Sequence, residues 1–263
     1  MLLTLSVENT NIVLGVFQGE NLLFTSRMAT DRTRTGDEYA IAFRNALTFH
    51  GIGPENLEGG ILASVVPALT PVLREAVFLA LGKIPLVVGP GVKTGLNIHM
   101  DNPAALGSDL VVNAVAAAAE YSLPLIVVEL DTAVTLSAID GKGRFVGTVI
   151  APGASVAAAA LADACDQLPK VSLEAPREVI GKNTVDSMRS GTVYGAAAMV
   201  DGLLERMETQ MGSSCTVVAT GSLAGIIIPL CRREIPVDVH LSMKGLRRIY
   251  EKNTEKRRKV GEE

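Results

Sequence analysis

Two stretches far apart in the chain share one pattern of strands and turns. Residues 3–17 give a strand, a polar turn and a second strand, and after a short Gly-containing turn a third apolar strand runs from Leu22 to Ser26. Residues 125–137 repeat this pattern, and a third strand follows from Phe145 to Ile150. Short Gly-containing turns between β-rich runs are typical of hairpins. A β-meander at the start of each half therefore predicts a duplicated fold of two lobes, each with a sheet edged by helices.

The segments between these meanders alternate between helical and short apolar patterns. Apolar residues recur near a 3.6-residue period over residues 37–50, which predicts a helix. Residues 109–121 are rich in Ala and Val, with Asn113 as the only polar residue between Asp109 and Glu120, so we expect a helix buried on most sides. We also expect one long helix or two, and a C-terminal helix, over residues 184–211 and 243–253. Further short strands are expected at residues 60–66, 84–88 and 216–219.

The lobe boundary is predicted near residues 120–124. Pro124 disfavours continuation of the preceding helix and comes just before the second meander. The sequence thus predicts an N-terminal lobe of residues 1–120, a C-terminal lobe of residues 121–253 and a charged tail of residues 254–263.

Composition limits the class of protein. Hydrophobic residues make up 48% of the chain and charged residues 20%, which allows a sizeable core and excludes global disorder. The formal net charge of −4 argues against a strongly basic nucleic-acid-binding surface. No apolar run approaches the roughly 18 residues of a membrane-spanning helix. The first basic residue is Arg27, and the three cysteines sit at no metal-ligand spacing. We therefore expect a cytoplasmic protein with no nucleic-acid or membrane partner.

Common catalytic motifs are not present in the sequence. There is no G-x-x-x-x-G-K-[ST] phosphate loop and no G-x-S-x-G nucleophile elbow. Residues 89–95 approach a dinucleotide fingerprint, but the last glycine comes one place late, so a tight turn is the favoured interpretation.

Polar turns follow the first strand of each meander. Residues 8–11 and the pair Asp131-Thr132 offer backbone N–H groups and threonine hydroxyls, which can bind phosphate. The same residue types also suit an ordinary polar hairpin, and the residues alone leave both interpretations open.

The loop of residues 101–109 ends in an acid just where the apolar helix begins. Asp109 could be a helix N-cap, or a general base held beside a cleft at the lobe boundary, and the two roles are compatible.

An ordered series of segments gives the chain a family resemblance. The segments are Asp31-Arg32, Thr35, Asp37-Glu38-Tyr39, Ser64-Val65-Val66-Pro67, Val88 to Leu96, Asp101-Asn102-Pro103, Val112 to Val115, Ala151-Pro152-Gly153, Asn183-Thr184 to Met188, Ser190-Gly191, Tyr194-Gly195, Ala219-Thr220-Gly221, Gly245-Leu246-Arg247 and Ile249-Tyr250-Glu251. Together they resemble type III pantothenate kinase over residues 1–253.

The resemblance implies an α/β fold of two ribonuclease H-like lobes, that of the acetate and sugar kinase/Hsp70/actin superfamily. It implies ATP-dependent phosphorylation of pantothenate to 4′-phosphopantothenate, the first step of coenzyme A biosynthesis. ATP with Mg²⁺ and a monovalent cation (K⁺ or NH₄⁺) are the implied cofactors. Both substrates are expected in the cleft of the two lobes, and the chain is expected to form a homodimer.

The resemblance also assigns site residues. Asp109 matches the family's proton acceptor, which takes the proton of the pantothenate hydroxyl. The pantothenate positions are Met100, Gly107, Ser108, Asp109, Leu110 and Thr184, of which Thr184 is expected to reach the site from the neighbouring subunit. The ATP phosphate positions are Ser6, Val7, Glu8, Asn9, Thr10, Asn11, Asp131 and Thr132, and Glu129 matches the ligand of the monovalent cation.

Several of these positions differ from the family pattern. The first loop resembles Asp-Val-Gly-Asn-Thr, but Ser6 lacks the carboxylate and Glu8 replaces the glycine. In the second loop Asp131 replaces a glycine, and on the substrate side Met100 and Leu110 replace a Tyr and an Arg. Ser222 replaces the second glycine of an Ala-Thr-Gly-Gly segment. A new carboxylate 4 Å from a phosphate would cost on the order of 4 kcal/mol at a surface-like effective dielectric constant.

Three hypotheses follow from the sequence. The chain is a working pantothenate kinase with unusual loops, or a catalytically silent paralogue that acts as a binding or regulatory subunit and completes the site of an active partner in a heteromer. The third is a kinase for another acceptor, because Met100 and Leu110 would make the acceptor pocket more apolar.

Overall fold

The chain folds into two compact units. The computed structural model describes residues 1–260, and for residues 255–260 it describes the backbone alone. The first unit comprises residues 1–96, 102–116 and the C-terminal segment from Leu241, and the second comprises residues 97–101 and 117–240. Of the predicted charged tail, residues 261–263 and the side chains of residues 255–260 lie outside the described residues.

The first unit is built on a five-stranded sheet in the order β3-β2-β1-β4-β5. Its first three strands form the antiparallel meander that the sequence predicts, and β4 and β5 continue the sheet in parallel with β1. The strands are β1 (Leu2–Val7), β2 (Asn11–Gln18), β3 (Asn21–Ala29), β4 (Gly59–Ser64) and β5 (Leu86–Val87).

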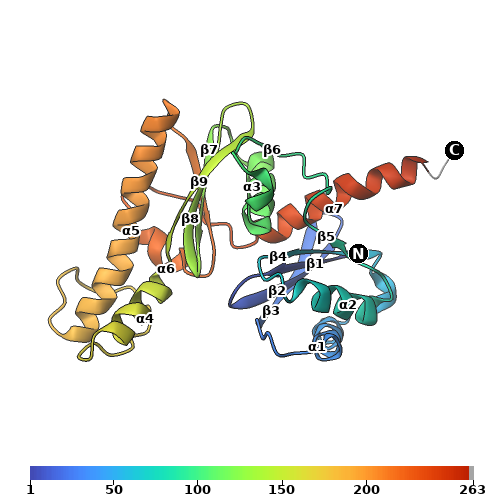
Figure 1. The fold of residues 1–263 in the computed structure, drawn as a ribbon, viewed down its shortest axis with the longest axis horizontal. Coiled ribbons are helices and arrows are strands. Elements are labelled where there is room, and N and C mark those ends of the chain that lie inside the picture. Colours follow the sequence, from blue (N-terminus) through green and yellow to red (C-terminus); the bar gives the residue numbers. More distant parts are fainter. Residues whose placement is uncertain (261–263) are drawn as a thin grey trace. The chain divides into compact units, whose positions relative to one another are not determined.

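Helices cover both faces of this first sheet. The helical elements are α1 (Gly36–Phe49), η1 (Pro54–Asn56), α2 (Thr70–Leu81), η2 (Pro103–Ala105), α3 (Ser108–Glu120) and α7 (Leu241–Val260). Side chains alternate between the faces of a strand, so Leu3, Leu5 and Val7 of β1 pack with the buried residues of α1 and α2. In Figure 1 these two helices lie side by side along the sheet. Leu2 faces the opposite side and belongs to a smaller core with α7 and Val112 of α3.

Helix α7 fits tightly against the rest of the first unit. A Cβ atom at Gly245 would lie 2.0 Å from the carbonyl oxygen of Val112, so only glycine allows α7 to approach α3 this closely. Arg247 is buried, lies 5.7 Å from the centre of the Phe17 ring and pairs with Glu251 at 2.7 Å. These contacts explain why the C-terminal helix groups with the first unit, although its residues follow the second unit in the sequence.

The second unit has a sheet of the same kind, in the order β10-β7-β8-β9-β6. An antiparallel meander is again extended next to its first strand by a parallel strand, here β10. The strands are β6 (Asn97–Ile98), β7 (Leu125–Leu130), β8 (Ala133–Ile139), β9 (Arg144–Pro152) and β10 (Thr216–Thr220). The duplicated meander is thus confirmed.

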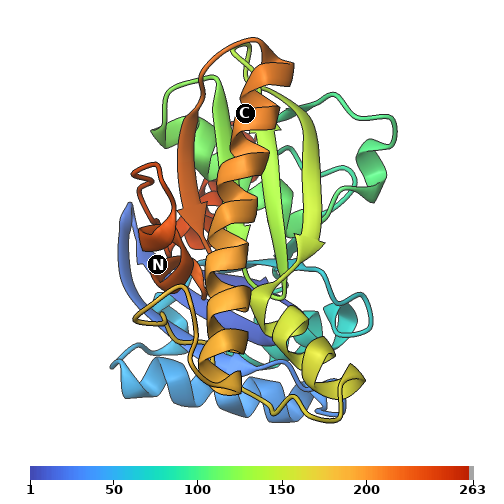
Figure 2. The same ribbon diagram turned by 90° about the vertical axis from the view of Figure 1, so that its left-hand side faces the viewer.

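One long helix packs across the second sheet. The helical elements are α4 (Ala154–Ala164), α5 (Thr184–Met211), α6 (Ala224–Ile227) and η3 (Ile228–Leu230). Figure 2 shows α5 running along the sheet with α4 beside one end. Buried residues of α5, among them Val193, Ala197 and Val200, pack against alternate residues of β7 and β8. Residues 184–211 therefore form a single helix, the first of the two alternatives that the sequence left open.

The observed element boundaries differ from the predicted ones by one or more residues, and the differences at α7 and α3 are the most consequential. Helix α7 runs from Leu241 to Val260, longer than the expected residues 243–253. Helix α3 begins at Ser108, so Asp109 lies inside the first turn and not at the N-cap position. The predicted C-terminal lobe of residues 121–253 includes most of α7, whereas α7 belongs to the first of the two compact units.

Two cysteines belong to the second core. Cys215 is buried among its apolar residues, and Cys231 packs against the same cluster, where burial raises the pKa of its thiol to about 11. Among the described residues no helix is both long and apolar enough to cross a membrane.

The close approach at Gly245 gives a testable expectation. We expect Gly245→Ala to lower the free energy of unfolding by about 1–3 kcal/mol, because the added methyl must push α7 away from α3. Urea unfolding measures the change. The matched control is Gly225→Ala in α6, where an added Cβ meets no atom within 4 Å and no loss is expected. Equal stability of wild type and Gly245→Ala would contradict the packing described for α7.

Candidate functional site

In the first unit, the polar turn lies where two parallel strands end together. Val7 at the end of β1 pairs with Ser64 at the end of β4, and the backbone N–H of Val65 donates to the carbonyl of Val7 at 3.0 Å. The turn after β1 is closed by a bond from the N–H of Glu8 to the carbonyl of Asn11 at 2.9 Å. Ligands of α/β sheets bind outside the carboxyl ends of parallel strands. This edge is therefore the candidate site of the first unit.

The predicted phosphate residues of this turn differ in accessibility. Ser6 and Val7 are buried inside β1, so only the backbone of this strand end can contact a ligand. Asn9 and Thr10 are exposed at the tip of the turn, and the amide of Asn11 donates to the hydroxyl of Thr10 at 3.0 Å. The exposed polar groups of the turn are therefore those of Asn9 and Thr10.

A second loop braces the turn. The hydroxyl of Thr30 donates to the carbonyl of Glu8 at 2.7 Å, and its backbone N–H donates to the carbonyl of Thr10 at 3.0 Å. The hydroxyl of the buried Tyr39 accepts from the N–H of Asp31 at 3.0 Å and donates to its carbonyl at 2.7 Å. The start of α1 is thus connected through this loop to the polar turn.

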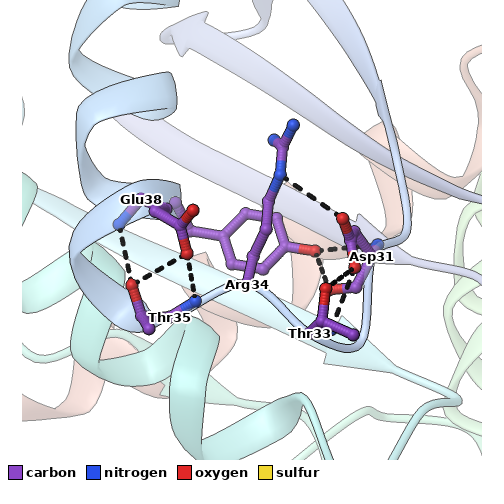
Figure 3. A network of polar contacts seen from close by, with 6 residues as sticks. Asp31, Thr33, Arg34, Thr35 and Glu38 are labelled. Atoms are coloured by element: carbon purple, nitrogen blue, oxygen red, sulfur yellow. Dashed lines mark hydrogen bonds and ion pairs between the residues drawn. The ribbon is translucent and has the colours of Figure 1, made fainter.

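Figure 3 shows the polar network at the start of α1. The carboxylate of Asp31 accepts from the N–H and hydroxyl of Thr33 at 2.9 and 2.6 Å, and these bonds lower the pKa of Asp31. Thr35 and Glu38 form a capping box, in which Glu38 accepts from the Thr35 N–H at 2.8 Å. Asp31, Thr35 and Glu38 belong to the segments that carry the family resemblance, but the sequence alone assigned them no role. The T-x-x-E spacing was the signal that could have identified the cap.

Asp109 lies at the same edge of the first sheet. The hydroxyl of Ser108 donates to the carbonyl of Ser64 at 3.0 Å, which fixes the start of α3 at the end of β4. The Oδ1 atom of Asp109 accepts from the N–H of Leu110 at 2.8 Å. A Cβ at Gly107 would lie 2.4 Å from that oxygen, so a larger residue at this position would displace the carboxylate.

Burial changes the ionisation of the Asp109 carboxyl. Burial raises its pKa above the usual 3.8, and the backbone N–H groups of Leu110 and of Asp109 itself partly oppose this effect. A carboxylate with a raised pKa binds a proton more readily, which suits a general base. The predicted N-cap role is wrong, because the cap would lie before Ser108 and the carboxylate bonds within the first turn.

The other predicted substrate residues are spread over the two units. Leu110 is buried next to Asp109, whereas Met100 is a half-buried residue just after β6 of the second unit. Thr184 begins α5 and is exposed, with Asn183 capping the helix through a bond from the N–H of Asp186 at 2.9 Å.

The second unit has its own polar edge, at the ends of the parallel strands β7 and β10. The Asp131 carboxylate accepts from the hydroxyl of Ser222 at 2.5 Å and from its N–H at 3.2 Å. Gly221 has a φ of +100°, and a Cβ there would lie 2.5 Å from the carbonyl oxygen of Leu130. Likewise, a Cβ at Gly153 would lie 2.1 Å from the carbonyl oxygen of Asp131. The loops are packed so closely that glycine is needed at both places.

Oxygen ligands gather around Glu129 in the same unit. Glu129 is 9% exposed in β7 and pairs with Thr135 of β8 on one side and Thr220 of β10 on the other, both buried. The hydroxyl of Thr135 has no hydrogen-bond partner among the described residues. Carboxylate oxygens of Glu129 and Asp131 lie within 4.8 Å of each other. Hydroxyl and carboxylate oxygens are the ligands that hard cations prefer, so these residues fit a cation.

Comparisons with known proteins agree with this architecture. The activator of 2-hydroxyisocaproyl-CoA dehydratase from Clostridium difficile, solved with bound ADPNP, aligns with a TM-score of 0.61 at 11% identity over 98% of this chain and 97% of that chain. The ROK hexokinase from Thermus thermophilus aligns with a TM-score of 0.50 at 14% identity over 97% of this chain and 99% of that chain. The fold is that of the acetate and sugar kinase/Hsp70/actin superfamily, with two ribonuclease H-like lobes.

Sequence comparison gives the family. Residues 2–206 match the family model described as type III pantothenate kinase. The type III pantothenate kinase of Moorella thermoacetica is 46% identical over 254 residues, which cover 97% of this chain and 100% of that protein. The chain belongs to the type III pantothenate kinase family.

The raised pKa of Asp109 makes stability depend on pH in a defined direction. The folded carboxyl binds its proton more tightly than the unfolded one, so its contribution to stability is fully present below pH 3.8 and is lost as pH rises through the folded pKa. We expect Asp109→Asn, which cannot ionise, to gain stability relative to wild type at pH 7.5 compared with pH 3.5. Urea unfolding at the two pH values measures this difference.

Asp31→Asn is the control with the opposite sign. The pKa of Asp31 is lowered, so its favourable contribution is present above pH 3.8 and is lost as pH falls. This variant should lose stability relative to wild type at pH 7.5. A pH-independent effect of Asp109→Asn would show that burial does not raise the pKa of Asp109.

Proposed function

We propose that this chain phosphorylates pantothenate at the expense of ATP and yields 4′-phosphopantothenate and ADP, the first step of coenzyme A biosynthesis. The observation that carries the proposal is Asp109, a carboxyl with a raised pKa at the end of β4, in a chain of the type III pantothenate kinase family. The curated relatives that it matches over nearly their whole length bear this activity in their names.

The proposed step is a single phosphoryl transfer. The pantothenate hydroxyl oxygen forms a bond to the γ-phosphorus, and the bond from that phosphorus to the β,γ-bridging oxygen breaks, so that ADP leaves with the electron pair. Asp109 takes the hydroxyl proton and later releases it to solvent. Gly107 has no Cβ that would collide with this carboxylate, and the bond from Ser108 to Ser64 fixes the start of the helix that carries it. Positioning and charge neutralisation supply most of the catalysis in such reactions.

The substrate contacts are part of the proposal. Met100 and Leu110 are assigned to apolar contacts with pantothenate, and Thr184 to a contact across a homodimer, which its exposure at the start of α5 permits. The lobe boundary near residues 120–124 belongs to the proposal, with α7 counted in the first lobe and not in the second. A cytoplasmic location belongs to the same proposal.

The phosphates of ATP are assigned to both polar turns. In the first unit, residues Ser6 to Asn11 would contribute backbone groups and the exposed side chains of Asn9 and Thr10. In the second unit, Asp131 and Thr132 follow β7. Mg²⁺ is assumed to accompany ATP and to neutralise phosphate charge. Glu129, with Thr135 and Thr220, would hold the monovalent cation, whose charge would also offset the carboxylate of Asp131.

Loss of the proposed base tests the function directly. We expect Asp109→Asn to lower kcat roughly 10²–10⁴-fold, because an amide cannot accept the hydroxyl proton. Mass spectrometry of 4′-phosphopantothenate formed from pantothenate, ATP, Mg²⁺ and K⁺ measures turnover. Glu55→Gln, on the exposed surface of η1 in the same unit, is the control and should retain activity. An inactive wild type with intact fold would refute the proposal and favour the silent paralogue.

The Asp131 carboxylate gives a second test. We expect Asp131→Asn to tighten ATP binding roughly tenfold or more, because it removes one negative charge near the phosphates and keeps an acceptor for Ser222. Calorimetric titration with MgATP measures the Kd. Asp140→Asn, in the turn between β8 and β9, is the control for loss of a carboxylate in the same unit. Weaker binding by Asp131→Asn would mean that the carboxylate assists ATP by holding a cation.

A further inference from the structure

Asn113 is a buried amide without a partner among the described residues, in the apolar helix α3 of the first unit. It is 2% exposed in α3, and its neighbours Val112 and Ala114 are 1% and 0% exposed. Neither the amide nitrogen nor the amide oxygen has a hydrogen-bond partner among the described residues. Buried polar side-chain atoms in native proteins are nearly always hydrogen-bonded. An apolar residue of the same size would avoid this loss, so the amide needs an explanation outside the packing of α3.

The helix geometry aims Asn113 at the first turn of α3. Asp109 precedes it by four residues, so both lie on one face of the helix with their Cβ atoms roughly 5–6 Å apart. Side chains on a helix lean toward its N-terminus, so the Asn113 amide covers the turn that carries Asp109.

The two oxygens of the Asp109 carboxylate differ in their contacts. Its Oδ1 atom accepts from the N–H of Leu110 at 2.8 Å and faces Gly107. The Oδ2 atom lies farther from Gly107, 4.0 Å from the position of a Cβ there, and the bond from the Leu110 N–H goes to Oδ1. A donor behind Oδ2 would fix the rotation of the carboxylate.

We propose that Asn113 is a positioning residue for Asp109, whose second carboxylate oxygen it hydrogen-bonds through one buried water molecule. Buried water typically makes two to four bonds to polar groups that would otherwise lack partners. Here it satisfies the amide and holds the carboxylate in one orientation toward the acceptor hydroxyl. This inference rests on the proposed role of Asp109 as the proton acceptor.

The arrangement has a chemical consequence. A hydrogen bond donated to the charged form of a carboxyl lowers its pKa, and so opposes the effect of burial. Burial is the largest cause of the raised pKa of Asp109, opposed by the N–H groups of Leu110 and Asp109. No charged side chain of the described residues is among these causes. Asn113 is therefore the neutral side chain placed to keep Asp109 ionised and able to accept a proton.

The test removes the amide and follows Asp109 itself. In Asn113→Leu, ¹³C-carboxyl NMR should show the Asp109 titration moving to higher pH, with about a tenfold rise in its proton affinity, or one pKa unit. The Asp109 signal is assigned by its loss in Asp109→Asn. The acidic limb of the kcat profile should move to higher pH by the same amount, while KM for ATP stays within about twofold.

Two further variants make the outcome decisive. Asn113→Val also lacks the amide and replaces Asn113→Leu if the larger side chain prevents folding. Thr192→Val is the matched control, since it removes a buried polar group from helix α5, in the second unit, and should leave the Asp109 titration unchanged.

The NMR titration needs no turnover, so it separates the two proposals. An inactive wild type whose Asp109 titration still responds to Asn113→Leu would overturn the function and leave the coupling intact. A folded Asn113→Leu or Asn113→Val protein with the wild-type titration of Asp109 would overturn the role of Asn113.

Discussion

Parallel pairing beside an antiparallel meander decides where the polar residues of this chain gather. In the first unit β1 pairs with β4, and in the second β7 pairs with β10, so in each sheet two strands end at one edge. The chain leaves each of these strands through a polar or glycine-containing loop. The turn after Val7 and the start of α3 meet at one edge because Ser108 bonds to Ser64. Without the parallel pair, the turn and Asp109 would have no common support.

Burial and hydrogen bonding act in opposite directions on Asp109, and their balance sets its chemistry. The N-terminus of a helix favours an anion, and the N–H of Leu110 stabilises the carboxylate. Burial opposes both effects and prevails, so the pKa is raised. A carboxylate held more strongly by donors would be too weak a base, and one in deeper apolar surroundings would carry its own proton. The proposed bond from Asn113, one helical turn away, would keep the pKa of Asp109 between these extremes, because its amide is a neutral donor.

Local signals made much of the fold predictable, and contacts between distant segments made the rest unpredictable. Both meanders were predicted from apolar runs and glycine-containing turns. Helix α3 was predicted from an apolar pattern that only Asn113 interrupts. The return of α7 to the first unit depends on Gly245 against Val112, a contact between segments far apart in the chain. Nothing near Gly245 in the sequence indicates which backbone it meets. The N-cap interpretation of Asp109 fails by two residues for a similar reason, because the bond from Ser108 to Ser64 fixes where the helix starts.

The Asp131–Ser222 pair changes the meaning of the altered phosphate loop. A carboxylate in place of the glycine of the family pattern suggests that the loop has lost both its structure and its charge complementarity to phosphate. The hydrogen bonds of Asp131 show that the loop has kept its structure. Asp131 receives two bonds from Ser222, and the glycines at 153 and 221 still allow the backbone of the neighbouring loops to approach it closely. The loop therefore folds with the carboxylate as part of its hydrogen-bonding scheme, and the substitution bears on the charge that a ligand meets. The weakening of phosphate binding proposed for this loop therefore concerns the charge of Asp131 and not the shape of the loop.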